Sequence, residues 1–375
     1  MRRRIHNYFI RRLREGVGKV GALEESALGL LSSLYGLAVR CRNQGYDREW
    51  FRIRWIPRPT LSVGGLIAGG VGKTPAVMLI AETLLQMGRS PLILLRGYGA
   101  PQAPGAPVPV DPFLPGIWKT AGDEASLLAR RCPQAVVIAH SDRYRSAAWA
   151  VEHLSFDTVL LDDGFQHRRL GRDLDLVCLD AARPLGAGCL LPQGDLREPP
   201  QGLRRAGGFL LSRSSEERTS FQKDLLPEAP VMRMVWRLAD ELTPLAGGPV
   251  VSPADLRGKR TGVVAGIGRP HRFQRDIESL GFNIVWSWSL PDHEPLSGRD
   301  VETIKAARKK NDVDLILITE KDAVRWEEPL NEIPGVYWVR GSAGWAGDED
   351  RRKFLELFEG ALVSFEGRKK QGRPR

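Results

Sequence analysis

The stretch GGLIAGGVGKTP, residues 64 to 75, decides how this chain is expected to fold. A glycine-rich turn between a strand and a helix lets backbone N–H groups converge on phosphate oxygens at the positive end of the helix. In such a phosphate-binding loop the lysine of Gly-Lys-Thr reaches the β- and γ-phosphates, and the threonine hydroxyl binds Mg²⁺. The usual spacing places a first glycine at position 67, where this chain has Ile67. The stretch therefore predicts a nucleotide site with an altered front end, against the alternative of a chance glycine turn.

The flanks of the stretch favour the nucleotide site. An apolar strand, LSVGG, precedes the glycines, and a helix is expected from Thr74 to Met87. Proline is tolerated in the first turn of a helix because its missing N–H would be unpaired there. We predict that Lys73 contacts the phosphates during catalysis and that Thr74 binds the metal. The residues predicted to bind the nucleotide are Gly69, Gly70, Gly72, Lys73, Thr74 and Pro75.

An acidic pair follows a second apolar strand. In TVLLDDG, Asp162 ends the apolar run, which is the pattern that supplies a Mg²⁺ carboxylate in phosphate-loop enzymes. The alternative is that Asp162 and Asp163 only cap the following turn, as Asp often does before Gly. Two adjacent carboxylates exceed what a cap needs, so the pattern favours a metal role for Asp162.

The motifs of a GTPase are missing. A GTPase carries Asn/Thr-Lys-x-Asp after a late strand, whereas here Lys321 and Asp322 are adjacent. The Asp-x-x-Gly switch is also absent around Asp162. A GTPase is therefore not predicted.

Apolar strands alternate with helical stretches on both sides of these motifs. From Pro59 onward this alternation predicts an α/β fold, a doubly wound and mostly parallel sheet of the P-loop NTPase type. A second series near the C-terminus predicts a smaller α/β domain. The proline-rich segment 100–116 is expected to be a long exposed connection, either a lid or an insertion. We divide the chain into a basic arm with an amphipathic helix (1–55), a P-loop kinase core (56–230), an extended linker (231–249), the smaller domain (250–345) and a C-terminal helix with a basic tail (346–375).

Charge and cysteine content limit the partners and the compartment. The net charge of +10 predicts attraction to something anionic, and residues 1–19 carry seven Arg or Lys against one Glu. The basic residues cluster at the termini, and no central strand interleaves aromatic and basic residues, so nucleic acid is not a predicted partner. The four cysteines are far apart, which suggests neither a zinc site nor a disulfide framework and fits a reducing cytosol.

An amphipathic helix follows the basic arm. Its apolar residues recur at steps of three and four, and the run is too short to span a bilayer. We favour a helix that lies on an anionic membrane surface, against the alternative of a helix packed on the protein's own core. The residues of the apolar face are Leu23, Ala27, Leu30, Leu34, Leu37 and Cys41.

Eight motifs follow one another along the chain. They are SVGGLIAGGVGKTP, LLRGYG, GDEASLLAR, LLDDGFQHRRLGRDLDL, LPQGDLREPP, GIGRPHRF, PDH and TEKDAVR. In this order they resemble the tetraacyldisaccharide 4'-kinases, the lipid A 4'-kinases of Gram-negative bacteria, from about Pro59 to Arg325. DDGFQHRRL and LPxGxLREP are the most specific of these pieces.

The resemblance implies an activity and a location. It implies transfer of the γ-phosphate of ATP, with Mg²⁺, to the 4'-hydroxyl of an acylated disaccharide 1-phosphate during lipid A biosynthesis. It also implies a peripheral enzyme at the cytoplasmic face of the inner membrane, and no required protein partner is evident. An anionic lipid substrate would explain the basic, amphipathic N-terminus.

The resemblance also implies residue roles. Asp123 of GDE corresponds to a general base near the acceptor hydroxyl, assisted by His293 of PDH from the second domain; a carboxylate can orient a sugar hydroxyl and take its proton. Arg197 and Glu198 of LREP correspond to a phosphate clamp and a metal-side carboxylate. The residues implied to bind the substrate are Arg96, Arg143, Asp163, Gln166, His167 and Arg197.

Each of these roles has a plainer alternative. Asp123 could only cap the helix EASLLARR, and His293 could be a surface residue. His167 could belong to a solvated charge cluster with Arg168 and Arg169. The segment 320–322 either lines the nucleotide side of the cleft or caps a helix.

The chain departs from the family pattern at three places. Gly65 replaces an asparagine, Arg269 stands where Gly-Asn-Pro is usual, and Glu294 replaces a histidine that often follows His293. Only the last departure touches the implied base. The alternative enzyme class is a membrane-associated P-loop ATPase with a regulatory or mechanical role, which would need a water-positioning residue and an arginine finger that the sequence does not indicate.

Overall fold

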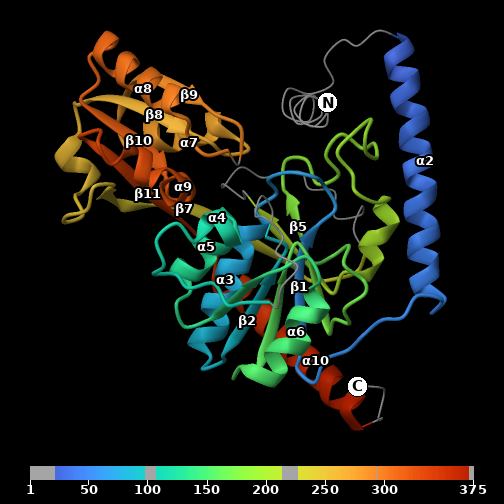
Figure 1. Ribbon diagram of the computed structural model, residues 1–375. Helices are drawn as coiled ribbons and strands as arrows, with labels where there is room; N and C mark the ends of the chain where they lie inside the picture. The colour runs from blue at the N-terminus through green and yellow to red at the C-terminus, as the bar shows by residue number, and fades with distance from the viewer. Residues whose placement is uncertain (1–21, 98–106, 213–226, 293, 371–375) are drawn as a thin grey trace.

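One mixed sheet organises the molecule (Figure 1). The computed structural model describes residues 22–97, 107–212, 227–292 and 294–370, and in this part of the chain the sheet has the order β3-β2-β4-β1-β5-β6-β7-β11-β10-β8-β9. The strands are β1 (Thr60–Gly65), β2 (Pro91–Leu95), β3 (Val136–Ala139), β4 (Thr158–Asp162), β5 (Leu174–Asp180), β6 (Gly208–Ser212), β7 (Val231–Pro244), β8 (Arg260–Ala265), β9 (Asn283–Ser289), β10 (Leu315–Thr319) and β11 (Val336–Trp345). The helices are α2 (Ala22–Asp47), α3 (Lys73–Gln86), α4 (Trp118–Ala121), α5 (Asp123–Arg131), α6 (Arg143–His153), α7 (Pro270–Ser279), α8 (Gly298–Lys310), α9 (Glu320–Leu330) and α10 (Asp348–Lys370), with short 3₁₀ helices at Pro200–Arg205 and Pro253–Leu256.

The half of the sheet from β3 to β6 has the predicted doubly wound form. Strands β1, β2, β4 and β6 are buried at every position, which is expected of parallel strands covered on both faces. Alternate residues of these strands pack against α3, α5 and α10 on one face and against α6 on the other. Strand β1 pairs in parallel with β4 and β5, so the loops that follow β1 and β4 leave the same edge of the sheet. The predicted α/β fold is confirmed.

Strand β7 joins the two halves of the sheet. Its first residues pair in parallel with β6, and most of its length pairs antiparallel with β11. The segment expected to be an extended linker is thus a paired strand over Val231–Pro244. Its alternation shows why: Met232 and Met234 are buried, while Arg233 between them is exposed. The second α/β unit, β8 to β11 with α7 to α9, continues the same sheet.

Strand β6 and helix α9 are among the elements that the predicted alternation does not include. Thr319 caps α9, because its side-chain oxygen accepts a hydrogen bond from the backbone N–H of Asp322 at 3.1 Å. The helix buries Trp326 completely and packs on α5 of the core. This places the TEKD segment at the contact between the two α/β units.

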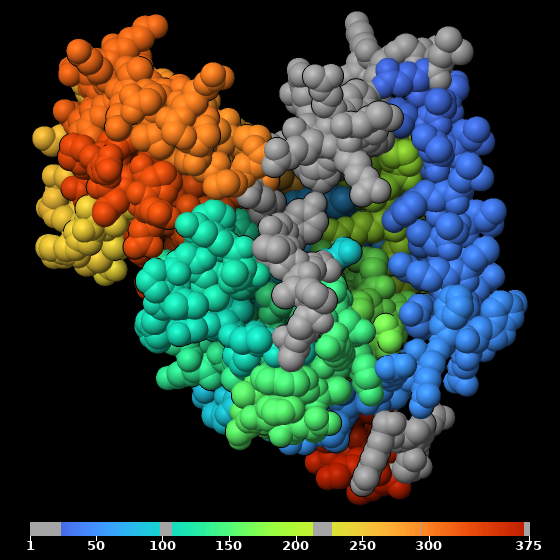
Figure 2. Space-filling view, viewed as in Figure 1, coloured from blue at the N-terminus to red at the C-terminus, as the bar shows by residue number. Residues whose placement is uncertain are grey.

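Helix α2 forms a column along one side of the molecule (Figures 1 and 2). One face packs on the core, where Ser32 Oγ donates a hydrogen bond to the carbonyl of Leu190 at 2.9 Å. The predicted apolar face lies on the opposite side, where Leu30, Leu34 and Leu37 are 65%, 55% and 58% exposed. Helix α2 thus packs on the protein's own core, as the alternative has it, but through another face, and the predicted apolar face is exposed. No helix among the described residues has the length and apolarity needed to cross a membrane.

Candidate active site

The glycine-rich loop connects β1 to α3, as predicted. Gly69 and Gly72 have φ angles of 117° and 85°, which other residues rarely adopt, and Gly72 is the N-cap of α3. The Lys73 ammonium donates a hydrogen bond to the carbonyl of Gly69 at 3.3 Å. Thr74 and Pro75 follow in the first turn of the helix. The loop thus has the strand–turn–helix form of a phosphate site.

Ile67 fastens the front of the loop. It is 6% exposed and forms an antiparallel bridge with Leu196. Backbone hydrogen bonds on either side, from Ala68 to Asp195 and from Arg197 to Leu66, extend this contact at 2.7 and 2.8 Å. The backbone around the position of the usual glycine therefore pairs with the LREP segment, and the Ile67 side chain is buried.

Asp163 is held as an anion beside the lysine. Arg197 Nη1 contacts both of its carboxylate oxygens at 2.7 and 2.6 Å, and Lys73 Nζ lies 3.7 Å from Oδ1. Burial alone would raise the pKa of Asp163, but Lys73 and Arg197 bring it below its ordinary value. Lys73, Asp163 and Arg197 therefore form one charged chain next to the loop.

The pKa of Asp162, unlike that of Asp163, is raised. Burial, together with the charges of Glu124 and Asp163, raises the pKa of Asp162 to about 7. Its Oδ1 is buried and has no hydrogen-bond partner.

These residues fit a Mg²⁺ ion. An unpartnered buried carboxylate oxygen is costly unless something binds it, and a cation would also favour its ionised form. In the described part of the chain no group of three or more His, Cys, Asp or Glu is arranged for a metal. Mg²⁺ is commonly held by one or two carboxylates together with substrate phosphates and water. Asp162, with Thr74 across the loop, matches that pattern.

Glu198 is a fully buried support. Its Oε1 accepts a hydrogen bond from the Gln166 amide at 2.8 Å, and its Oε2 accepts from Asn43 and Arg205 at 3.0 and 2.8 Å. Gln166 in turn donates to the carbonyl of Gly65 at 3.0 Å. Both oxygens of Glu198 are thus occupied by protein donors, and its metal role stays a prediction. Asn43, from α2, is a member of this network that the sequence did not indicate.

The basic candidates lie near the same edge of the sheet. Arg143 begins α6, is 6% exposed and has a buried Nε without a hydrogen-bond partner. Burial lowers its pKa, and the neighbouring charge of exposed Arg96 acts in the same direction. Burial and nearby arginines lower the pKa of His167 to about 4, so its imidazole is neutral. A neutral, half-buried His167 does not match the alternative of a solvated charge cluster.

Asp123 is buried and faces cations from the second unit. It is 4% exposed and lies in the first turn of α5, where its Oδ1 accepts a hydrogen bond from the backbone N–H of Glu124 at 2.9 Å, so it also supports the start of the helix. Its Oδ2 is 3.6 Å from Lys321 Nζ and 3.5 Å from Arg325 Nη1. His293, the predicted assistant, lies outside the described residues. Sequence reasoning gave Lys321 only a general place in the cleft and missed Arg325; the one available signal was their spacing of four on a single helix.

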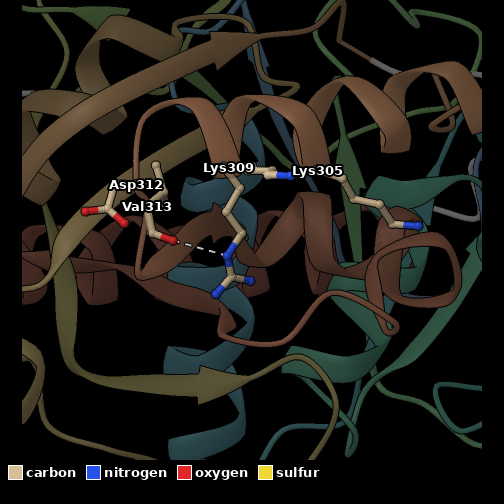
Figure 3. A pocket seen from close by; sticks show the side chains of 5 residues that line it. Lys305, Lys309, Asp312 and Val313 are labelled. Carbon is tan, nitrogen blue, oxygen red and sulfur yellow. Dashed lines mark hydrogen bonds between the residues drawn. The ribbon is translucent and has the colours of Figure 1, made fainter.

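A pocket of about 330 Å³ opens on the second unit, away from the residues described above (Figure 3). It is lined by Lys305, Arg308, Lys309, Asp312 and Val313. Arg308 Nε donates to the carbonyl of Val313 at 3.1 Å and so serves the turn after α8. The pocket contains none of the predicted site residues.

Comparisons with known proteins agree with this geometry. A family model described as LpxK, tetraacyldisaccharide-1-P 4'-kinase, matches residues 25–357. Tetraacyldisaccharide 4'-kinases of Syntrophus aciditrophicus and Anaeromyxobacter dehalogenans are 39% and 38% identical to this chain. These matches cover 80% and 93% of this chain and 83% and 91% of the relatives.

A solved structure gives the same result. The crystal structure of LpxK from Aquifex aeolicus in complex with ATP has a TM-score of 0.69 and 28% identity, and the match covers 90% of this chain and 99% of that chain. The family match extends from α2 into α10 and so includes both α/β units. The chain belongs to the tetraacyldisaccharide-1-P 4'-kinase family.

Proposed function

We propose that this chain transfers the γ-phosphate of ATP to the 4'-hydroxyl of an acylated disaccharide 1-phosphate, in lipid A biosynthesis. One observation carries the proposal beyond family membership. Lys73 of the phosphate loop, the ion-paired Asp163 and the unpartnered Asp162 meet at the ends of neighbouring strands β1 and β4. This is the arrangement that phosphoryl transfer needs on the nucleotide side.

On the nucleotide side, the loop from Gly69 to Gly72 and Lys73 bind the phosphates. Thr74 and Asp162 hold Mg²⁺, which when bound neutralises charge on the β- and γ-phosphate oxygens. Arg197 keeps Asp163 beside Lys73 and thereby fixes the lysine over the loop. These contacts orient the nucleotide for an in-line transfer.

On the acceptor side, Asp123 orients the 4'-hydroxyl and takes its proton. A sugar hydroxyl is a weak nucleophile, and a carboxylate can both orient it and take its proton. Arg143 meets an anionic group of the substrate, because its buried guanidinium has an unused Nε. Arg96, Gln166 and His167 complete the proposed substrate side.

The exposed face of α2 is proposed to hold the enzyme on the anionic surface of the inner membrane. A helix with one apolar face lies in the interface and buries that face among lipid headgroups and chains. Leu30, Leu34 and Leu37 supply this face, while the opposite face is bonded to the core through Ser32. ATP as the phosphate donor supports a location of the site on the cytoplasmic side.

The test is a micelle assay with γ-labelled ATP, Mg²⁺ and the acylated disaccharide 1-phosphate. We expect label on the lipid with the wild-type protein and none with Lys73→Ala. Reactions without lipid are the control. Release of inorganic phosphate at the same rate with and without lipid would contradict the proposal and indicate an ATPase.

A further inference from the structure

We infer that Lys321 and Arg325, both on α9 of the second α/β unit, position the carboxylate of Asp123 toward the acceptor hydroxyl. The inference rests on the proposed role of Asp123 as the base. It assigns part of the base's site to a helix more than one hundred residues after Asp123 in the sequence. Neither residue needs to touch the substrate, so both are positioning residues.

Lys321 lies among carboxylates from both units. Its Nζ is 3.6 Å from Asp123 Oδ2, 3.7 Å from Glu124 Oε1 and 2.8 Å from Asp292 Oδ1. The side chain is only 16% exposed. Burial would lower the pKa of Lys321, but Asp123, Glu124 and Asp292 together raise it above its ordinary value. The ammonium is therefore a fixed positive charge beside the proposed base.

Arg325 approaches the same oxygen from deeper in the protein. Its side chain is 1% exposed, and Nη2 donates to the carbonyl of Gly266 at 2.7 Å and to the carboxylate of Asp322. Asp322 is itself fixed, because it accepts hydrogen bonds from Gly266 N at 3.1 Å and from Thr319 Oγ1 at 2.7 Å. The plane of the guanidinium is therefore set by its own unit.

The remaining edge of that guanidinium points to the core. Nε and Nη1 are buried without a hydrogen-bond partner, and Nη1 lies 3.5 Å from Asp123 Oδ2. Buried polar groups nearly always form hydrogen bonds, so two buried nitrogens without one, next to a carboxylate, need an explanation. A small approach of α9 to α5 would complete a charge-assisted hydrogen bond to Asp123.

Another ion pair in the same interface shows what a purely structural role would look like. Lys119 of α4 pairs with Glu328 of α9 at 2.9 Å, with side chains 56% and 82% exposed. An exposed pair of this kind contributes little to stability, and it does not touch Asp123. This pair connects the same two units as Lys321 does. Removing it therefore serves as a control that weakens the contact between the units without changing the surroundings of the base.

The charged groups around Asp123 decide the sign of the test. In the described residues these are Lys321 and Arg325 from α9, Glu124 from its own helix and Asp292 from the segment after β9. Cations next to an Asp lower its pKa by about 1 to 3 units. Removing Lys321 leaves the anionic neighbours in place, so Asp123 would take up a proton at higher pH.

The experiment measures kcat and KM of the full-length enzyme against pH in mixed micelles, for wild type, Lys321→Met, Lys321→Arg and the control Lys119→Met. For Lys321→Met we expect the acid limb of kcat to move up by about 1 pH unit or more and kcat to fall about 10- to 100-fold, with KM for ATP nearly unchanged. Lys321→Arg should restore the acid limb, and Lys119→Met should behave as wild type. An acid limb of Lys321→Met that coincides with wild type would overturn the inference.

A second variant covers the case in which Lys321→Met does not fold. Asp292→Asn removes a competitor for the ammonium from a segment outside the helices and strands, so Lys321 pairs more fully with Asp123 and the acid limb moves to lower pH. An unmoved or upward-moving limb in this variant counts against the inference. Failure of the wild-type protein to label the lipid would instead contradict the proposed function, so the two failures are distinguishable.

Discussion

Gly64→Ala tests how closely the acidic loop rests on the first strand. Gly64 is buried in β1, and a Cβ at this position would lie 2.5 Å from Phe165 Cβ and 2.7 Å from Phe165 N. Ordinary carbon contacts need about 3.5 to 4.0 Å, so the loop after β4 would have to move by about 1 Å. Overpacking of a core costs about 1 to 3 kcal/mol, and we expect the upper end because the backbone of Phe165 is one of the atoms in the way.

Two assays follow from this displacement. A loss of about 3 kcal/mol lowers Tm by about 4 °C in a chain of 375 residues, because the entropy of unfolding is about 2.1 cal/mol/K per residue; thermal unfolding measures this shift. The same movement shifts Asp162 and Asp163 relative to Lys73, and a misplacement of about 1 Å can lower turnover about 100-fold in the lipid kinase assay.

The control is the same chemical change where space is open. Gly360 lies in the exposed interior of α10, and an added Cβ there meets nothing within 4 Å. Gly360→Ala should raise stability by about 0.5 to 1 kcal/mol, because alanine favours a helix over glycine. A Gly64→Ala protein that unfolds at the wild-type temperature and keeps wild-type turnover would refute the reasoning.

Three further predictions concern other parts of the molecule. Burial and Glu124 raise the pKa of Asp162 to about 7 from 3.8, so this group stabilises the fold at low pH and its contribution is lost as pH rises through that interval. The variant Asp162→Asn should therefore show a thermal stability that changes less with pH over this range. Its Mg²⁺-dependent turnover should fall about 100-fold or more. The double variant Leu34→Glu, Leu37→Glu should leave Tm nearly unchanged but weaken binding to anionic vesicles about tenfold or more per leucine, as measured by sedimentation. Unchanged sedimentation would contradict the membrane role of α2. Arg197→Met removes two charge-assisted contacts to Asp163, so that this carboxylate pairs more closely with Lys73. The affinity for ATP, measured by calorimetry, should then fall about tenfold. An unchanged Kd would show that Lys73 does not depend on Arg197.

The nucleotide half of the site was predictable because its signals are local. The glycine turn, the strand before it and the Asp pair each lie within a few residues, and parallel strands bring their carboxyl ends to one edge without further information. The state of Asp162 and Asp163 was not predictable, since it depends on Glu124 and Arg197 from distant segments.

The acceptor half depended on long-range contacts. Lys321 and Arg325 reach Asp123 only because α9 packs on α5, and the TEKD letters read equally well as a helix cap, which Thr319 and Asp322 in fact form. The segment of β7 resembles an extended linker in the sequence, although in the sheet it pairs first with β6 and then with β11. Pairing of this kind is a property of the assembled sheet rather than of the segment.

Strand β7 also restricts how the second unit can move. Sliding the unit along the strand would break the antiparallel ladder to β11, whereas rotation only alters the twist between neighbouring strands, which varies by about 10 to 35° among sheets. The strand therefore works as a torsion joint rather than a flexible tether. Because α9 lies beyond β7 from the core, a small rotation would change how closely Lys321 and Arg325 approach Asp123.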